Sequence, residues 1–333
     1  MEQTILFGNG INMVDNAHFQ WSEMLRRISD GHYYSQEGVP NTIQYESILQ
    51  SVHCNTSAHC KFPSNFYDTE DGLKGRLKKE LEELSRCIVS NSLYHSLFSI
   101  PAEFYLTTNY EGFYESVIRE MGYKSDGKEH NSEVAYNMRR RKDWENQEEK
   151  RNITIWTPHG TCEKESSMML GLDQYVGSIA RLNSYFNSGS VFGSCNGDLR
   201  DYQRKLHNMR KRNSNCTYPY ICHRVENYRL QWNLRFWVDT FFLTDVHIIG
   251  FGFSFDEIDL WWVLIRRKRL IELEKLSVKN RIMFYGYAPS VIRSMLEDNG
   301  VDVSCCITEK PKDWKAMYEN NISRINDYIM EQK

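Results

Sequence analysis

The sequence of 333 residues lacks a long uninterrupted apolar run and a strong excess of charge of either sign. Its most apolar long stretch, residues 236–255, is broken by Asp239 and Asp245, and no basic segment opens the chain, so neither export nor membrane spanning is expected. The formal net charge of −3 is too small to indicate a membrane or nucleic-acid partner. The basic run 204–212 is typical of a solvated helix face, so nucleic-acid binding is not indicated.

The sequence also lacks any Cys-x-x-Cys pair, although it contains nine cysteines. An odd number of cysteines without such spacing is typical of reduced thiols, and we therefore predict a cytoplasmic protein without a bound metal. Two Cys/His groupings, one around His53 and Cys54 and one around Cys222 and His223, leave a structural zinc as the alternative.

Short β-rich apolar runs alternate with helical patterns along the chain. The expected strands are residues 4–7, 103–108, 153–157, 246–251, 281–287 and 301–306. Apolar faces that indicate helices comprise Leu73, Leu77, Leu81, Leu84 and Ile88 in one segment and Ile258, Trp261, Trp262 and Ile265 in another. This alternation predicts an α/β fold with a Rossmann-like, doubly wound, mostly parallel sheet and helical insertions.

Two polar segments interrupt the alternation, at about residues 29–70 and 187–230. We interpret both as insertions, because neither continues the pattern of strands and helices. No internal repeat or low-complexity linker marks a boundary, so residues 1–333 are predicted to form a single domain.

Ligands of an open parallel sheet bind beyond the carboxyl ends of its strands, so the residues that follow each expected strand are candidates. The first strand is followed by Gly8-Asn9-Gly10-Ile11-Asn12. Glycines allow close backbone approach, and a following helix offers free N–H groups, which together predict a phosphate or diphosphate site. A dehydrogenase fingerprint would have a third glycine where this sequence has Met13. The alternative is a glycine turn that serves packing alone.

Two further strand ends each present one side chain suited to catalysis. Asn109 follows the strand 103–108, and its carboxamide can hold a water or a sugar hydroxyl, while Thr108 and Glu111 have the spacing of a capping box. The alternative role of Asn109 is to cap the helix itself. His159 follows the strand 153–157, and an imidazole suits proton transfer at neutral pH, although a lone histidine there is more often structural.

A fourth strand end is again rich in glycine. Its backbone, at Gly250, Gly252 and Ser254, is predicted to lie against a ribose or phosphate. Ser254 and Glu257 have the spacing of a second capping box. We assign the neighbouring acids to helix capping and to complementing the helix dipole; these acids are Asp256, Glu257 and Asp259.

Taken together and in this order, the glycine turn, TTNYE at 107–111, PHG at 158–160 and GFGFS at 250–254 resemble the sirtuin-like family. The likeness is specifically to prokaryotic sirtuin-like NAD hydrolases of anti-phage defence systems. It implies that Asn109 and His159 are catalytic. It assigns NAD binding to Gly8, Asn9, Gly10, Asn12, Thr108, Gly250, Gly252 and Ser254. The chain departs from protein-deacylating sirtuins because it lacks their four-cysteine zinc module, and Glu111 stands where they have an aspartate.

The resemblance implies an NAD⁺ hydrolase that cleaves the nicotinamide–ribose bond and acts as a defence effector by NAD depletion. NAD is then the substrate, and an activating or regulatory partner protein encoded nearby, or assembly into a homo- or hetero-oligomer, is expected to control it. The alternatives are an NAD-dependent protein deacylase and a non-catalytic NAD-binding scaffold subunit.

Overall fold

The computed structural model describes residues 1–15, 20–29, 31, 38–58, 66–86, 92–125, 137–189, 217–226, 234 and 236–333. Most of the expected insertion 187–230 and the whole basic run 204–212 therefore lie outside the described residues, as does Ile88. Within the part of the chain that is described, none of the helices is long and apolar enough to cross a membrane.

One sheet of eight strands forms the centre of the molecule, in the order β3-β4-β5-β2-β1-β6-β7-β8. Six of the strands are parallel, and in chain order they follow the 3-2-1-4-5-6 arrangement of doubly wound dinucleotide-binding sheets. The fold is thus α/β and Rossmann-like, as predicted. The parallel strands are β1 (Gln3–Phe7), β2 (Phe104–Thr107), β5 (Arg151–Trp156), β6 (Asp245–Ile249), β7 (Ile282–Tyr287) and β8 (Asp302–Ile307).

The six predicted strands are all present, whereas two antiparallel strands at one edge were not predicted. These are β3 (Lys124–Ser125) and β4 (Arg141–Asn146), and β4 pairs with β5. The sequence of β4, RKDWEN, is polar because most of its side chains are partly exposed and only Trp144 and Asn146 are buried. A strand of this composition gives no apolar run for pattern analysis to find.

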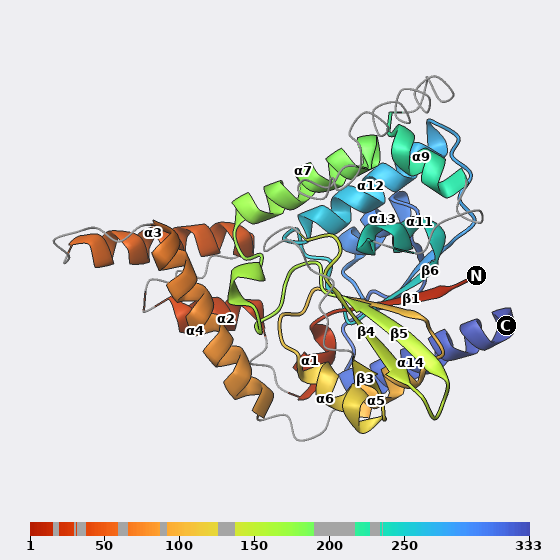
Figure 1. The fold of residues 1–333 in the computed structure, drawn as a ribbon, viewed down its shortest axis with the longest axis horizontal. Helices are drawn as coiled ribbons and strands as arrows, with labels where there is room; N and C mark the ends of the chain where they lie inside the picture. Colours follow the sequence, from red (N-terminus) through yellow and green to blue (C-terminus); the bar gives the residue numbers. More distant parts are fainter. Residues whose placement is uncertain are drawn as a thin grey trace.

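Helices cover both faces of the sheet (Figure 1). One face packs against α7 (Leu172–Ser188), α9 (Pro219–Glu226), α11 (Thr240–Leu243), α12 (Ile258–Glu272) and α13 (Ser290–Asp298). The other packs against α1 (Gly10–Asp15), α5 (Ser92–Ser99), α6 (Phe113–Glu120) and α14 (Trp314–Gln332). Two short 3₁₀ turns, η2 (Glu165–Ser167) and η3 (Trp237–Asp239), complete the described elements.

Three helices form an arm that projects away from the sheet, at the left of Figure 1. They are α2 (Trp21–Ile28), α3 (Asn41–Ala58) and α4 (Phe66–Arg86), and their apolar side chains form a small core together with Cys162, Met168 and Leu170. The leucine face predicted for 73–84 lies in that core, where Leu73 and Leu77 are fully buried. Much of the segment 29–70, which we interpreted as an insertion, therefore belongs to this arm.

The helix predicted at 258–265 exists as α12, and its predicted face is buried only in part. Trp261 is buried, whereas Ile258, Trp262 and Ile265 are only partly buried. The fully buried positions include Asp259 and Leu260, followed one turn later by Val263 and Leu264. Asp259 is charged, so an apolar pattern does not include it, although it lies on the buried face of α12.

The cysteines only partly match the prediction of reduced thiols. Cys54, Cys162, Cys305 and Cys306 are free, whereas Cys222 is disulfide-bonded. The prediction of reduced thiols is therefore wrong for Cys222. The zinc alternative also rests on residues 59, 60 and 216, which are not among those described.

The order of the strands reverses at β1, because β1 lies between β2 and β6. Phe7 at the end of β1 is in register with Thr107 of β2 and with Ile249 of β6. The glycine turn after β1, the Asn109 segment after β2 and the second glycine turn after β6 therefore start at the same edge. In doubly wound sheets this reversal point is where ligands bind.

Candidate functional site

The two glycine turns pack directly against each other. The Gly8 amide donates to the Ile249 carbonyl over 3.0 Å, and the Gly10 amide donates to the Gly250 carbonyl over 2.8 Å. A Cβ atom on Gly8 would lie 2.6 Å from the Gly250 carbonyl oxygen, and Gly250 itself has a φ of 69°. Glycine is therefore required here for packing, and the amides of Gly8 and Gly10 are already used within the protein.

A cavity of about 470 Å³ opens at this edge of the sheet. It lies between the strand ends and the helical arm, which contributes Trp21, Met24 and Leu81 to its wall. Eight of the ten predicted site residues line it: Asn9, Gly10, Thr108, Asn109, His159, Gly250, Gly252 and Ser254. The structure thus brings the predicted carboxamide and imidazole to one cavity. The volume of this cavity is typical of small-molecule sites.

The other two predicted residues, Gly8 and Asn12, do not line the cavity. Gly8 lies beneath the ring of Phe251. Asn12 is fully buried, and its Nδ2 donates to Glu111 Oε1 over 2.5 Å and to Asn9 Oδ1 over 3.0 Å. The Tyr94 hydroxyl donates to Asn12 Oδ1 over 2.8 Å. Asn12 therefore supports the cavity floor from below.

Glu111 was predicted to close a capping box with Thr108, and this is wrong. The helix α6 begins only at Phe113, with Gly112 as its N-cap. Glu111 is instead buried beside the cavity, and burial raises its pKa to about 7, although its own backbone amide, Asn12 and Asn109 favour the ionised form. A carboxyl group that titrates near neutrality thus lies in the cavity wall.

Asn109 does not cap a helix either, so this alternative is also wrong. Its backbone amide donates to Thr107 Oγ1 over 3.2 Å, and its side chain is buried beside the cavity. Its carboxamide is close enough to Glu111 to favour the ionised carboxylate, but the Nδ2 atom meets the geometric criteria of a hydrogen bond with none of the described residues. An unpaired buried amide costs free energy, which a bound hydroxyl or water would recover.

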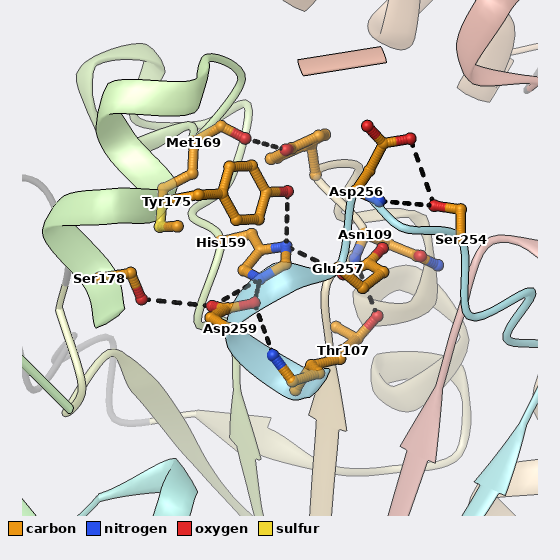
Figure 2. Close-up of polar contacts among 12 residues, drawn as sticks. Thr107, Asn109, His159, Met169, Tyr175, Ser178, Ser254, Asp256, Glu257 and Asp259 are labelled. Carbon is orange, nitrogen blue, oxygen red and sulfur yellow. Dashed lines mark hydrogen bonds and ion pairs between the residues drawn. The ribbon is translucent and has the colours of Figure 1, made fainter. Parts of the chain in front are cut away.

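His159 is held by Asp259 from the start of α12 (Figure 2). The His159 Nε2 atom lies 3.1 Å from both carboxylate oxygens of Asp259, and both residues are buried. Asp259 also accepts from Ser178 Oγ of α7 over 3.2 Å and from the Leu260 amide over 2.9 Å. Burial disfavours a charged imidazole, but Asp259 and Glu257 outweigh it and raise the pKa of His159 above its ordinary value.

The second ring nitrogen of His159 faces Tyr175 and Glu257. The His159 Nδ1 atom lies 3.4 Å from the Tyr175 hydroxyl and 3.7 Å from Glu257 Oε2. Glu257 was predicted to pair with Ser254 in a capping box, but it is the N-cap of α12 and its side chain makes no capping bond. Burial raises the pKa of Glu257 to about 7; His159 opposes this increase, whereas Asp259 and Asp256 add to it.

The third acid of this segment, Asp256, joins the second glycine turn to the helical arm. Its Oδ1 accepts from the Thr42 backbone amide over 3.1 Å, and its Oδ2 accepts from Asn41 Nδ2 over 2.9 Å, both at the start of α3. Ser254, predicted to cap α12, donates to Asp256 Oδ2 over 3.3 Å instead. Asp256 and Ser254 both line the cavity.

The family model for a SIR2-like domain matches residues 103–304, more than half of the chain. The chain belongs to the SIR2-like family. No curated protein matches it. SIR2-like domains bind NAD and are usually NAD-dependent enzymes, so an NAD-related activity fits this one. The matched segment includes Asn109, His159 and the second glycine turn, whereas the turn at Gly8–Gly10 precedes it.

Sequence reasoning missed the acids of this SIR2-like site. We had assigned Asp256, Glu257 and Asp259 to helix capping and the helix dipole. In the structure Asp256 contacts α3, Glu257 faces His159, and Asp259 is hydrogen-bonded to His159. The only sequence signal was the density of acids just after a glycine turn at a strand end. The spacing of a capping box explained these acids equally well. This spacing is local, so it carries no information about the distant residues that the acids contact.

The donor atoms of His159, Glu257 and Asp259 all lie within 4.8 Å of one another, which is close enough for a cation. The hydrogen bonds of His159 and Asp259 account for the grouping without a metal, and we assign none. Over the described part of the chain, the cavity lining contains no lysine or arginine but does contain Glu111, Asp256 and Glu257. The electrostatics of this SIR2-like site therefore favour a cationic group beside His159.

Proposed function

We propose that this SIR2-like protein is an NAD⁺ hydrolase that cleaves the nicotinamide–ribose bond and releases nicotinamide and ADP-ribose. The observation that carries the proposal is the convergence of Asn109 and His159 on one cavity at the reversal point of the sheet. The site would bind NAD as substrate, with Asn9, Gly10, Gly250 and Gly252 beside the nucleotide.

The chemistry of the bond matches the charges of the cavity. Nicotinamide in NAD⁺ is a positively charged leaving group, and cleavage of a glycosidic bond passes through a state in which the ribose carries positive charge. Ionised Glu111 and Glu257 in the wall would stabilise that charge in a site of low dielectric. The unpaired Nδ2 of Asn109 would hold a ribose hydroxyl or the attacking water.

His159 supplies the base. Its Nε2 is bound to Asp259, so Nδ1 is the nitrogen available to take a proton from water or from a ribose hydroxyl. Participation of a general base contributes about 10²- to 10⁴-fold to the rate. His159→Ala is therefore expected to lower nicotinamide release by that factor while calorimetry shows NAD binding little changed.

The matched control is His95→Ala, because His95 is a partly exposed residue of α5 outside the cavity. Asn109→Ala is expected to behave as His159→Ala does. Nicotinamide release by His159→Ala at the wild-type rate would refute the assignment of the base. Release that requires an added acetylated peptide would identify a deacylase. Binding of NAD without any release, even with the products of neighbouring genes present, would identify a scaffold.

We further propose that the protein is a cytoplasmic effector of an anti-phage defence system and acts by depleting NAD. The support for this role is the resemblance of its ordered motifs to such hydrolases. An unregulated NAD hydrolase would harm its own cell, so we infer that a partner protein or assembly into an oligomer activates it. Mixing the purified chain with NAD, with and without the products of neighbouring genes, tests this inference.

A further inference from the structure

The arrangement around His159 determines which ring nitrogen carries hydrogen. The Asp259 carboxylate already accepts from Ser178 Oγ and from the Leu260 amide, one on each oxygen, as an ionised carboxylate does. An ionised carboxylate can only accept hydrogen bonds, so the His159 Nε2 atom, which lies 3.1 Å away, must carry the hydrogen. Neutral His159 therefore has its free electron pair on Nδ1.

Groups from α7, from the start of α12 and from the segment after β2 lie on the Nδ1 side of the ring. Tyr175 of α7 presents its hydroxyl, and Glu257 at the start of α12 presents Oε2, while Tyr110 lies near Tyr175. Both tyrosines have pKa values raised by burial and remain neutral. Glu257 is thus the acid–base group that faces Nδ1.

Glu257 also links this buried cluster to solvent. The side chain of His159 is 2% exposed and that of Asp259 is 1% exposed, whereas that of Glu257 is 21% exposed. The Oε2 atom of Glu257 is itself buried and has no hydrogen-bond partner in the described part of the chain. Glu257 is therefore the carboxylate nearest to Nδ1 that can pass a proton from this nitrogen towards solvent.

We propose that Asp259, His159 and Glu257 form a proton relay, in which Asp259 positions the imidazole, His159 takes the proton at Nδ1, and Glu257 passes it to solvent. The relay rests on the hydrolysis proposed above. There the water oxygen bonds to the ribose carbon, nicotinamide leaves with the electron pair of the broken bond, and the water proton goes to His159. Asp259 is a positioning residue, since its carboxylate touches only the protein.

The first test needs no turnover. In the full chain labelled with ¹⁵N-histidine, with the His159 signal identified by its loss in His159→Asn, nitrogen shifts are expected to show hydrogen on Nε2. In Asp259→Asn the pKa of His159 is expected to fall, because the charge that raises it is gone. Hydrogen on Nδ1, or an unchanged pKa in Asp259→Asn, would overturn the positioning role of Asp259.

The second test is kinetic. Asp259→Asn is expected to lower kcat for nicotinamide release about 10²-fold with little change in KM, and to move the acidic limb of the pH profile to lower pH. Should Asp259→Asn fail to fold, Ser178→Ala leaves the carboxylate in place but removes the donor to its Oδ2, and it is expected to lower kcat several-fold. An unchanged kcat in the variant that folds would overturn the proposal.

The third test separates Glu257 from a merely structural residue. Glu257→Gln is expected to lower kcat about tenfold in dilute buffer, and rising imidazole concentration should restore it, because the added base removes the proton instead. The control is Glu272→Gln on the same helix, where Glu272 is an exposed partner of Lys268. If Glu257→Gln is as active as the wild type in dilute buffer, Glu257 does not take part in the relay.

These tests also separate the relay from the hydrolysis itself. A wild-type chain that binds NAD but releases no nicotinamide, either alone or with the products of neighbouring genes, would refute the proposed function and, with it, proton transfer through Glu257. The nitrogen shifts of His159 would still decide whether Asp259 positions the ring.

Discussion

Asp256 caps the N-terminus of α3 from across the cavity, because its Oδ1 accepts the Thr42 amide over 3.1 Å. The two residues are 214 positions apart in the sequence and belong to the glycine turn after β6 and to the helical arm. One carboxylate therefore attaches the arm to the edge of the sheet where the candidate site lies.

Removing this carboxylate is expected to loosen the arm. Loss of an N-cap typically costs about 0.5–2 kcal/mol, so Asp256→Ala should lower the free energy of unfolding by about 1 kcal/mol and speed hydrogen exchange at the first amides of α3. Asp256→Asn keeps an acceptor oxygen and should retain most of the protection. Asp298→Ala, at an exposed position of α13, is the control. Unchanged exchange in α3 of Asp256→Ala would show that the arm is held by other contacts.

The glycines of the two turns offer a matched pair of substitutions. A Cβ on Gly8 would meet Phe251 Cδ2 at 2.5 Å, whereas a Cβ on Gly252 would meet nothing within 4 Å. We expect Gly8→Ala to lower the free energy of unfolding by about 1–3 kcal/mol, as overpacking does, and Gly252→Ala to leave stability unchanged. Thermal unfolding measures both.

The same pair tests whether the second turn approaches a ligand. Gly252 lines the cavity, so its new methyl group would project into space that NAD is proposed to fill. Calorimetry on Gly252→Ala should then show weaker NAD binding by a fully stable protein. Equal affinity would place NAD away from this turn, while a loss of stability in Gly252→Ala would contradict the open space seen there.

An element can be predicted from the sequence when only one kind of structure produces its pattern of residues. The strands β1 and β6 are buried at every position, and a mostly apolar run that ends in glycine is typical of a buried parallel strand. The strand β4 has one side chain in the core at Trp144, so its polar sequence is indistinguishable from a loop.

Some residues of the candidate site can likewise be predicted from the sequence, and others cannot. Residues at strand ends, such as Asn109 and His159, are predictable because parallel strands deliver their carboxyl ends to one edge. The partners of those residues are not predictable, since Asp259 reaches His159 across 100 positions and no local pattern records which groups meet. Glu111 and Glu257 were misassigned because the spacing of a capping box is local and both sequences satisfy it.

Chelation tests the prediction that the site holds no metal. His159 Nε2 is bonded to Asp259, and both Asp259 oxygens accept from other groups, so these atoms already have partners without a cation. Dialysis against EDTA is therefore expected to leave nicotinamide release and the melting temperature unchanged. A loss of activity that added zinc or magnesium restores would contradict this expectation and assign the grouping to a metal.

Glu111 gives the stability of the protein a dependence on pH with a definite sign. Its side chain is 4% exposed, and its pKa rises from 4.5 to about 7 on folding. Between these values the folded state binds more protons than the unfolded state, so this group makes the free energy of unfolding fall as pH rises. The loss begins near pH 4.5 and is complete above pH 7.

Glu111→Gln should therefore stabilise the protein at pH 8 and not at pH 4. A pKa difference of one unit corresponds to about 1.4 kcal/mol, so the gain in the free energy of unfolding at pH 8 is at most about 3 kcal/mol. Asn12 can still donate to the amide oxygen of glutamine, so the substitution keeps this hydrogen bond. Urea unfolding across pH 4–8 measures it, with Glu115→Gln on α6 as the matched control. Equal stabilisation of Glu111→Gln at both pH values would mean that the carboxyl group does not titrate as its burial requires.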